Sequence, residues 1–154
     1  MIQRIQTVYL FIAAVLSAVC LVMPVGILVP EEVGVSSDIY NLFILTSDEE
    51  NKYDFSVCGM FFALAAATLL SLVTIFMYRK RRVQAGMCSM GAVLLLLWYV
   101  LYVLNVYTVA DDYNAVFALR LSASLPAVSL ILELLARRAI LKDEALVRAA
   151  DRIR

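Results

Sequence analysis

The sequence predicts an all-α integral membrane protein, built as a four-helix transmembrane bundle with a small extracytoplasmic loop element and a cytoplasmic C-terminal helix. The first observation is composition: 64% of the 154 residues are hydrophobic and 17% are charged, with a mean hydropathy of +0.88. A soluble domain has about 45–50% apolar and about 25% charged residues. The second is the presence of four long apolar runs, and the third is the gathering of cations on one side of them.

The four runs are close to the length of about 20 residues that crosses a bilayer as a helix. They cover residues 7–29, 55–78, 83–109 and 115–135. Pro24 lies near the end of the first run, and Arg120, Pro126 and Glu133 lie inside the fourth. No repeat, low-complexity tract or soluble linker separates the runs, so residues 1–154 are predicted to form one membrane domain.

The cations predict the orientation of the spans. Eleven of the 13 Lys and Arg residues lie before the first run, between the second and third, or after the fourth. The opposite side has Lys52 alone, together with nine acidic residues. Short cytoplasmic segments of membrane proteins carry an excess of Lys and Arg. Both termini are therefore expected in the cytoplasm.

The outer loop, residues 30–54, is too apolar for a free loop. Residues 34–38 have the composition of a turn, so we expect a β-hairpin with one strand near 25–29 or 33–35 and another near 39–45. A short interfacial helix over residues 40–45 is the alternative.

The tail, residues 136–154, has apolar residues at helical spacing and a favourable i,i+4 pair between Glu144 and Arg148. We expect the fourth span to continue into this tail as an amphipathic cytoplasmic helix. Its cations suit either the anionic inner leaflet or a cytoplasmic partner.

The chain begins Met-Ile-Gln-Arg-Ile-Gln-Thr, and this stretch leads directly into a span. A loop of about 25 residues, three more spans and a basic tail follow. This layout resembles an uncharacterised family of small four-span bacterial inner-membrane proteins, known only as a domain of unknown function. The resemblance covers essentially the whole chain, with the N-terminal stretch as its most specific part, and it implies no catalytic or binding residue.

Polar residues within the spans are the candidates for a functional site. Trp98, Tyr102 and Asn105 share one face of the third span. Arg120, near the outer end of the fourth span, is expected to join them in a polar pocket in the outer half of the bundle. It either reaches outward toward Asp111 or Asp112, or binds an anionic lipid head group, a ligand or a partner's carboxylate.

Small residues recur at every fourth position of the second span and predict a helix-packing ridge. The ridge consists of Gly59, Ala63, Ala67 and Ser71. Within a four-span chain it is expected to serve internal packing, with a dimer or partner interface as the alternative. Glu133 is expected to pair with Arg137, four residues further along the same helix.

The function expected from these features is non-enzymatic. The chain has no histidine, no Cys-x-x-Cys pair and no cluster of acids within the membrane, and neither cofactor nor metal is expected. The leading hypothesis is an interaction or assembly partner in a membrane complex. The alternative is a small homo-oligomeric transporter or channel, or a lipid-binding protein that uses the polar pocket. Membrane lipids, and either another membrane protein or a second copy of the chain, are the expected partners; nucleic acid is not.

Overall fold

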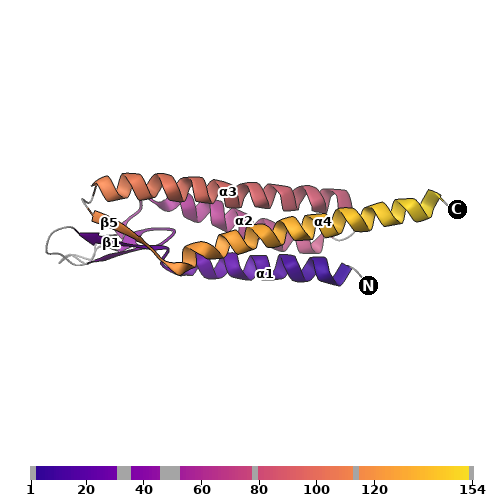
Figure 1. Cartoon of the computed structure of the whole chain (residues 1–154), viewed down its shortest axis with the longest axis horizontal. Helices are drawn as coiled ribbons and strands as arrows, with labels where there is room; N and C mark the ends of the chain where they lie inside the picture. Colours follow the sequence, from indigo (N-terminus) through magenta and orange to yellow (C-terminus); the bar gives the residue numbers. More distant parts are fainter. Residues whose placement is uncertain (1–2, 31–35, 46–52, 78–79, 113–114, 153–154) are drawn as a thin grey trace.

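Four long helices run side by side, with a small sheet at one end of the bundle (Figure 1). This is the arrangement in a computed structural model, which describes residues 3–30, 36–45, 53–77, 80–112 and 115–152. The helices are α1 (Gln3–Val22), α2 (Cys58–Phe76), α3 (Arg81–Asp112) and α4 (Leu125–Arg152). The start of α1 and the end of α4 both lie at the end opposite the sheet.

Three of these helices are long and apolar enough to cross a membrane: α1 over Ile5–Val22, α2 over Cys58–Phe76 and α3 over Arg81–Ala110. Their outward faces also carry large exposed apolar side chains, such as Phe11, Phe62 and Leu104. Helices that are apolar on both their inner and outer faces are typical of membrane spans.

The first predicted span, residues 7–29, is wrong at its outer end. Helix α1 ends at Val22, and the apolar residues that follow form strand β1 (Gly26–Pro30). Pro24 is the physical reason, because it has no backbone N–H to donate and disfavours helical geometry at Met23.

The fourth predicted span, residues 115–135, is wrong at its start. Residues Ala115–Leu119 form strand β5, Leu121–Ser124 form the short 3-10 helix η1, and α4 begins only at Leu125. All five residues of β5 pair with β1, from Gly26 opposite Leu119 to Pro30 opposite Ala115. Hydropathy alone does not separate a short apolar strand from a helix. Pro126 now lies in the first turn of α4, where a missing N–H is tolerated.

The hairpin predicted in the outer loop is confirmed, but its second strand is wrong, since it covers Ser37–Ile39 and not residues 39–45. Strand β1 pairs antiparallel with β2 (Ser37–Ile39), and residues 33–35, the other predicted site for the first strand, lie outside the described residues. The alternative helix over residues 40–45 is wrong, because a turn closed by a 2.9 Å bond from Tyr40 N to Phe43 O leads into β3 (Ile44–Leu45). Strand β4 (Tyr53–Asp54) completes a sheet of order β4-β3-β2-β1-β5.

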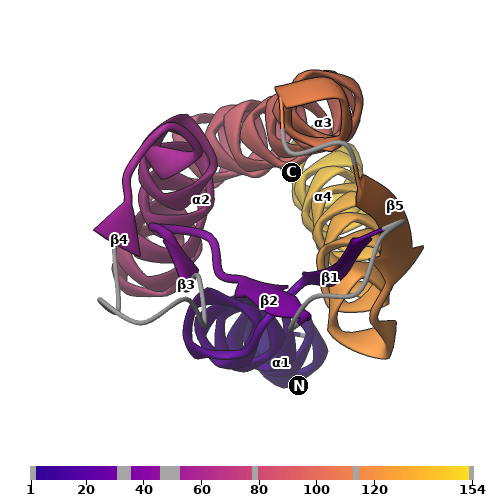
Figure 2. The same cartoon turned by 90° about the vertical axis from the view of Figure 1, so that its left-hand side faces the viewer.

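Each helix packs against two others, so that α1, α2, α3 and α4 follow one another around the bundle (Figure 2). Two apolar clusters fill the interior. The larger joins the sheet to the outer half of the bundle, with Leu28, Ile44, Leu64, Leu95 and Trp98 among its buried members.

The smaller cluster lies toward the chain termini and contains Leu10, Ala85, Cys88, Ala136 and Ile140. The helical tail is confirmed as far as Arg152, since α4 runs without a break from the bundle to that residue. Residues 153 and 154 lie outside the described part.

Candidate functional site

Two of the predicted pocket residues, Trp98 and Tyr102, are stacked beneath the sheet. Their ring centroids lie 5.1 Å apart with an angle of 14° between the planes, and both side chains are buried. Because they are four residues apart on α3, helical geometry alone places them together. Trp98 Nε1 donates to Asn41 Oδ1 over 2.8 Å, and Tyr102 Oη donates to the carbonyl of Val25 over 2.9 Å.

Asn41 was not predicted as a site residue, yet it joins three segments of the chain. Its side chain is fully buried, accepts from Trp98 and donates to the carbonyl of Cys20 at the end of α1 over 2.6 Å. The only signal in the sequence is a single amide within the apolar stretch of residues 39–45. Its hydrogen bonds satisfy backbone and side-chain groups that water does not reach.

Further polar contacts tie the sheet and the segment before α4 to the bundle. Tyr99 Oη donates to the carbonyl of Ala123 over 2.8 Å, and the Ser122 hydroxyl donates to the carbonyl of Pro24. The sheet together with η1 forms a cap at this end of the bundle, called the outer cap below. Hydrogen bonds to α1 and α3 hold it in place, as does apolar packing.

The predicted pocket in the outer half of the bundle is almost filled. Asn105 donates to the carbonyl of Leu101 on its own helix over 2.8 Å. The cavity beside Asn105 and Tyr102, which Phe117 also lines, has a volume of about 10 Å³. A cavity of this size holds one water molecule at most.

The side chain of Arg120 does not join Asn105 in a pocket. Arg120 lies in extended backbone between β5 and η1, and not inside a helix as predicted. Its guanidinium pairs with Asp38 of β2, with 2.7 Å between Arg120 Nη2 and Asp38 Oδ1. Asp38 was not predicted as its partner, and the side chains of Asp111 and Asp112, which were, lie outside the described part.

Replacing Arg120 with leucine is expected to reduce the free energy of unfolding by no more than about 1 kcal/mol, because both partners of the ion pair are partly exposed and solvent screens it. The check is a double-mutant cycle of Arg120→Leu and Asp38→Leu, followed by thermal unfolding in mild detergent. A coupling well above that value, or loss of the folded state in either single variant, would contradict this reading.

Three residues of the predicted ridge on α2, Ala63, Ala67 and Ser71, are buried inside the bundle. The fourth, Gly59, is exposed, and a Cβ built there would lie 3.9 Å from Leu101 of α3, in ordinary contact. The ridge therefore packs mainly against other helices of the same chain.

Two hydrogen-bonded polar side chains, Ser71 and Glu133, lie between the two apolar clusters. Glu133 of α4 is 1% exposed, and one of its carboxyl oxygens is hydrogen-bonded to the Ser71 hydroxyl of α2. Gly91 of α3 faces the same carboxyl group, since a Cβ built on Gly91 would lie 2.6 Å from Glu133 Oε1. The predicted pair with Arg137 is not among the ion pairs of the described residues, and the Arg137 side chain is exposed.

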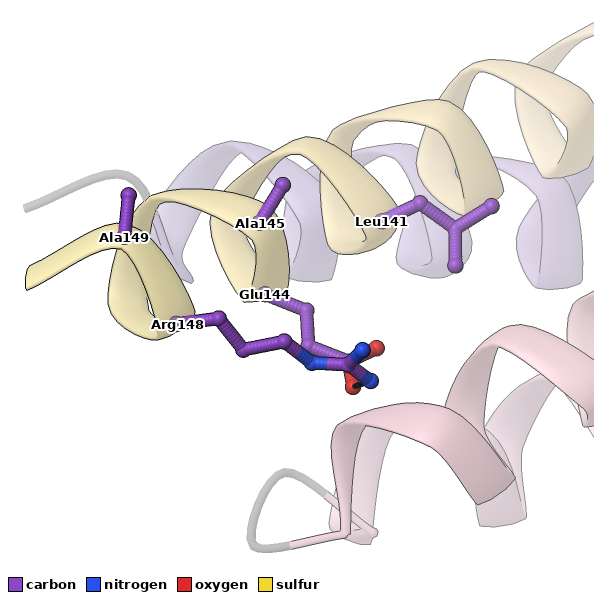
Figure 3. Close-up of a pocket in the computed structure, with 5 residues that line it drawn as sticks. All are labelled: Leu141, Glu144, Ala145, Arg148 and Ala149. Atoms are coloured by element: carbon purple, nitrogen blue, oxygen red, sulfur yellow. Dashed lines mark hydrogen bonds and ion pairs between the residues drawn. The ribbon is translucent and has the colours of Figure 1, made fainter. Parts of the chain in front are cut away.

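At the opposite end from the sheet, ion pairs connect α4 to the start of α3. Arg81 lies 3.2 Å from Asp143, and Arg82 lies 2.8 Å from Glu144. Glu144 also pairs with Arg148, as predicted from their spacing, and Figure 3 shows the two side chains meeting on the side of α4 opposite the Ala145 methyl group. The hydrogen bonds from Arg82 and Arg148 lower the pKa of Glu144, so this carboxylate stays charged at neutral pH.

Comparison with known proteins agrees with the resemblance seen in the sequence. None of the curated proteins matches the chain at a significant level. The family model described as "Domain of unknown function (DUF4293)" matches residues 2–153. The chain therefore belongs to this uncharacterised family.

Proposed function

We propose that the chain is a non-enzymatic, four-span protein of the bacterial inner membrane, and that it serves as an assembly partner in a membrane complex. In this proposal the cytoplasmic part of α4 is the surface that receives the partner. The observation that carries the proposal is the extension of α4 beyond the other helices at the end opposite the sheet (Figure 1).

The length and packing of α4 support a fourth span. The helix has 28 residues, which corresponds to about 42 Å at ~1.5 Å per residue. A hydrocarbon core of about 30 Å leaves about two turns of such a helix outside it. Helix α4 also packs against α1 and α3, which are both long and apolar enough to cross a membrane.

Reporter fusions test the four-span topology. Fusions after Leu45 and Asp112 are expected to be active only with a periplasmic reporter, because these positions lie on the side poor in cations. Fusions after Arg82 and Arg154 are expected to be active only with a cytoplasmic reporter. A periplasmic signal after Arg154 would contradict both the number of spans and the cytoplasmic location of the docking surface.

The chemistry of the projecting part of α4 supports an acidic, amphipathic segment of another protein as the partner. A shallow groove of about 410 Å³ lies between α4 and the start of α3, lined by Lys80, Arg82, Val83, Val147 and Arg148, among others. Its cations exceed its acids, and Val147 is 45% exposed beside them. Exposed apolar residues beside an excess of positive charge are typical of a surface that binds another molecule.

A transporter or channel is the weaker candidate. The polar side chains in the outer half of the bundle are used by internal hydrogen bonds, and the cavity beside them is about 10 Å³. Transporter sites near the bilayer midplane also commonly lie between two repeated halves of a fold, and this sequence contains no repeat.

Mild detergent extraction followed by native mass measurement tests the assembly proposal. We expect a heteromeric complex that is lost in Val147→Asp, because the new charge removes apolar contact from the groove. The control is Leu121→Asp, the same kind of change at an 88% exposed leucine at the other end of the bundle, which should retain the complex. A homo-oligomer of defined size, or a monomer that carries only lipid, would overturn the proposal.

A further inference from the structure

Glu133 lies where three helices meet inside the apolar bundle. On α4 it lies between Leu130, which packs with the larger apolar cluster, and Ala136 of the smaller one. Along α2 and α3, Ser71 and Gly91 likewise lie between members of the two clusters. The absence of a side chain at Gly91 leaves the space that the carboxyl group occupies. An ionisable group at this depth is expensive to bury, and carboxyls so placed in membrane proteins commonly carry protons.

The hydrogen bonds of Ser71 indicate which group holds a proton. A serine hydroxyl has one hydrogen to donate. Ser71 Oγ lies 2.9 Å from the carbonyl oxygen of Ala67, one turn earlier on α2, and it is also hydrogen-bonded to Glu133 Oε1. The Ala67 carbonyl can only accept. If the hydroxyl donates to it, as membrane-helix serines commonly do, then the bond to Glu133 needs a hydrogen on the carboxyl group.

The remaining surroundings of Glu133 also favour the neutral acid. Its second oxygen, Oε2, is buried and has no hydrogen-bond partner in the described part of the chain. An unpaired carbonyl oxygen in an apolar interior costs far less than an unpaired carboxylate oxygen. Among the described residues, Cys88 on α3 is a titratable neighbour and is buried, and Arg137, one turn along α4, has an exposed side chain. From α2, the uncharged Ser71 hydroxyl is hydrogen-bonded to Glu133.

We propose that Glu133 is a proton-binding site within the membrane, held as a neutral carboxylic acid that donates its hydrogen to Ser71 Oγ. Proton release leaves an uncompensated negative charge between α2, α3 and α4. Proton binding is thereby coupled to the packing of these three helices. This inference is independent of the docking surface on α4 and of the partner proposed for it.

Infrared spectroscopy of the protein in lipid bilayers tests the proposal. A protonated carboxylic acid has a C=O stretching band that a carboxylate lacks. We expect such a band at neutral pH in the unmodified protein, its loss in Glu133→Gln, and its retention in the matched control Glu144→Gln. Ser71→Ala should move the band to the position of a carboxyl group that makes no hydrogen bond. A carboxylic-acid band that is absent at neutral pH in the unmodified protein, or that persists unchanged in Glu133→Gln, would overturn the proposal.

Thermal unfolding supplies a second readout. The glutamine amide reproduces the hydrogen donor of the neutral acid, so Glu133→Gln should fold and should melt near the unmodified protein at low pH. As the pH rises, the unmodified protein should lose stability relative to the variant. The reason is that the Glu133 carboxyl group can release a proton, whereas the glutamine amide that replaces it cannot. A variant that fails to fold, or a melting difference that is independent of pH, would contradict proton binding at this site.

Discussion

The variant Trp98→Ala is expected to lose about 3–5 kcal/mol of unfolding free energy, the usual cost of truncating a buried large aromatic side chain. Trp98 has no exposed surface, stacks on Tyr102 and donates to Asn41. Its removal opens a cavity and leaves Asn41 Oδ1 without its donor. For a chain of this size, circular dichroism in mild detergent should show a melting temperature lower by about 6–20 °C.

Two further variants separate the causes of this loss. Trp98→Phe retains a stacked ring but removes the N–H group, and it is expected to cost about 1–3 kcal/mol for the buried oxygen left unpaired. Tyr107→Ala removes an aromatic side chain from the same helix at a position that is 73% exposed. It should melt close to the unmodified protein. Equal melting of Trp98→Ala and Tyr107→Ala would show that the outer cap does not depend on Trp98.

The second large effect is expected at Gly91. In Gly91→Ala the new methyl group would lie 2.6 Å from Oε1 and 2.8 Å from Cδ of Glu133. The carboxyl group is enclosed and bonded to Ser71, so it can move away only by breaking that bond. Overpacking of this kind typically costs about 1–3 kcal/mol. The measurement is thermal unfolding in mild detergent, as for Trp98.

Helix α3 supplies a matched control in Gly86. A Cβ built on Gly86 meets no atom within 4 Å. Gly86→Ala should therefore leave the melting temperature unchanged or slightly raised, since alanine favours the helix. Combining Gly91→Ala with Glu133→Ala should cost less than the sum of the two single changes, because the truncation restores space for the methyl group. If Gly91→Ala melted like Gly86→Ala, the close packing of Glu133 on α3 would be wrong.

The spans were predictable to different degrees. Helices α2 and α3 lie where their apolar runs predict them, because neither run contains a proline and the segment between them is strongly basic. The outer ends of the first and fourth runs were mistaken for helix. There, Pro24 ends α1, and β1 and β5 pair across about 90 residues of sequence.

In the candidate site, too, the contacts within one helix were predictable and the contacts between distant segments were not. Trp98 and Tyr102 were expected on one face of α3, and they stack because helical geometry is local. Their partner Asn41 comes from the outer loop, and the partner of Arg120 is Asp38 of β2. Neither contact follows from spacing along the chain. Glu133 was visible as an acid in an apolar run, yet its bond to Ser71 depends on how α2 and α4 pack.

The sequence by itself therefore determined the presence of apolar helices long enough to cross a membrane, the helical tail and the existence of a hairpin in the outer loop. These properties depend on composition and on periodicity within about 20 consecutive residues. Only the tertiary structure decided the pairing of β1 with β5, the closure of the outer pocket and the place of Glu133 between three helices. Those features depend on contacts between residues far apart in the chain, where each buried polar group takes whichever partner the packed helices bring within reach.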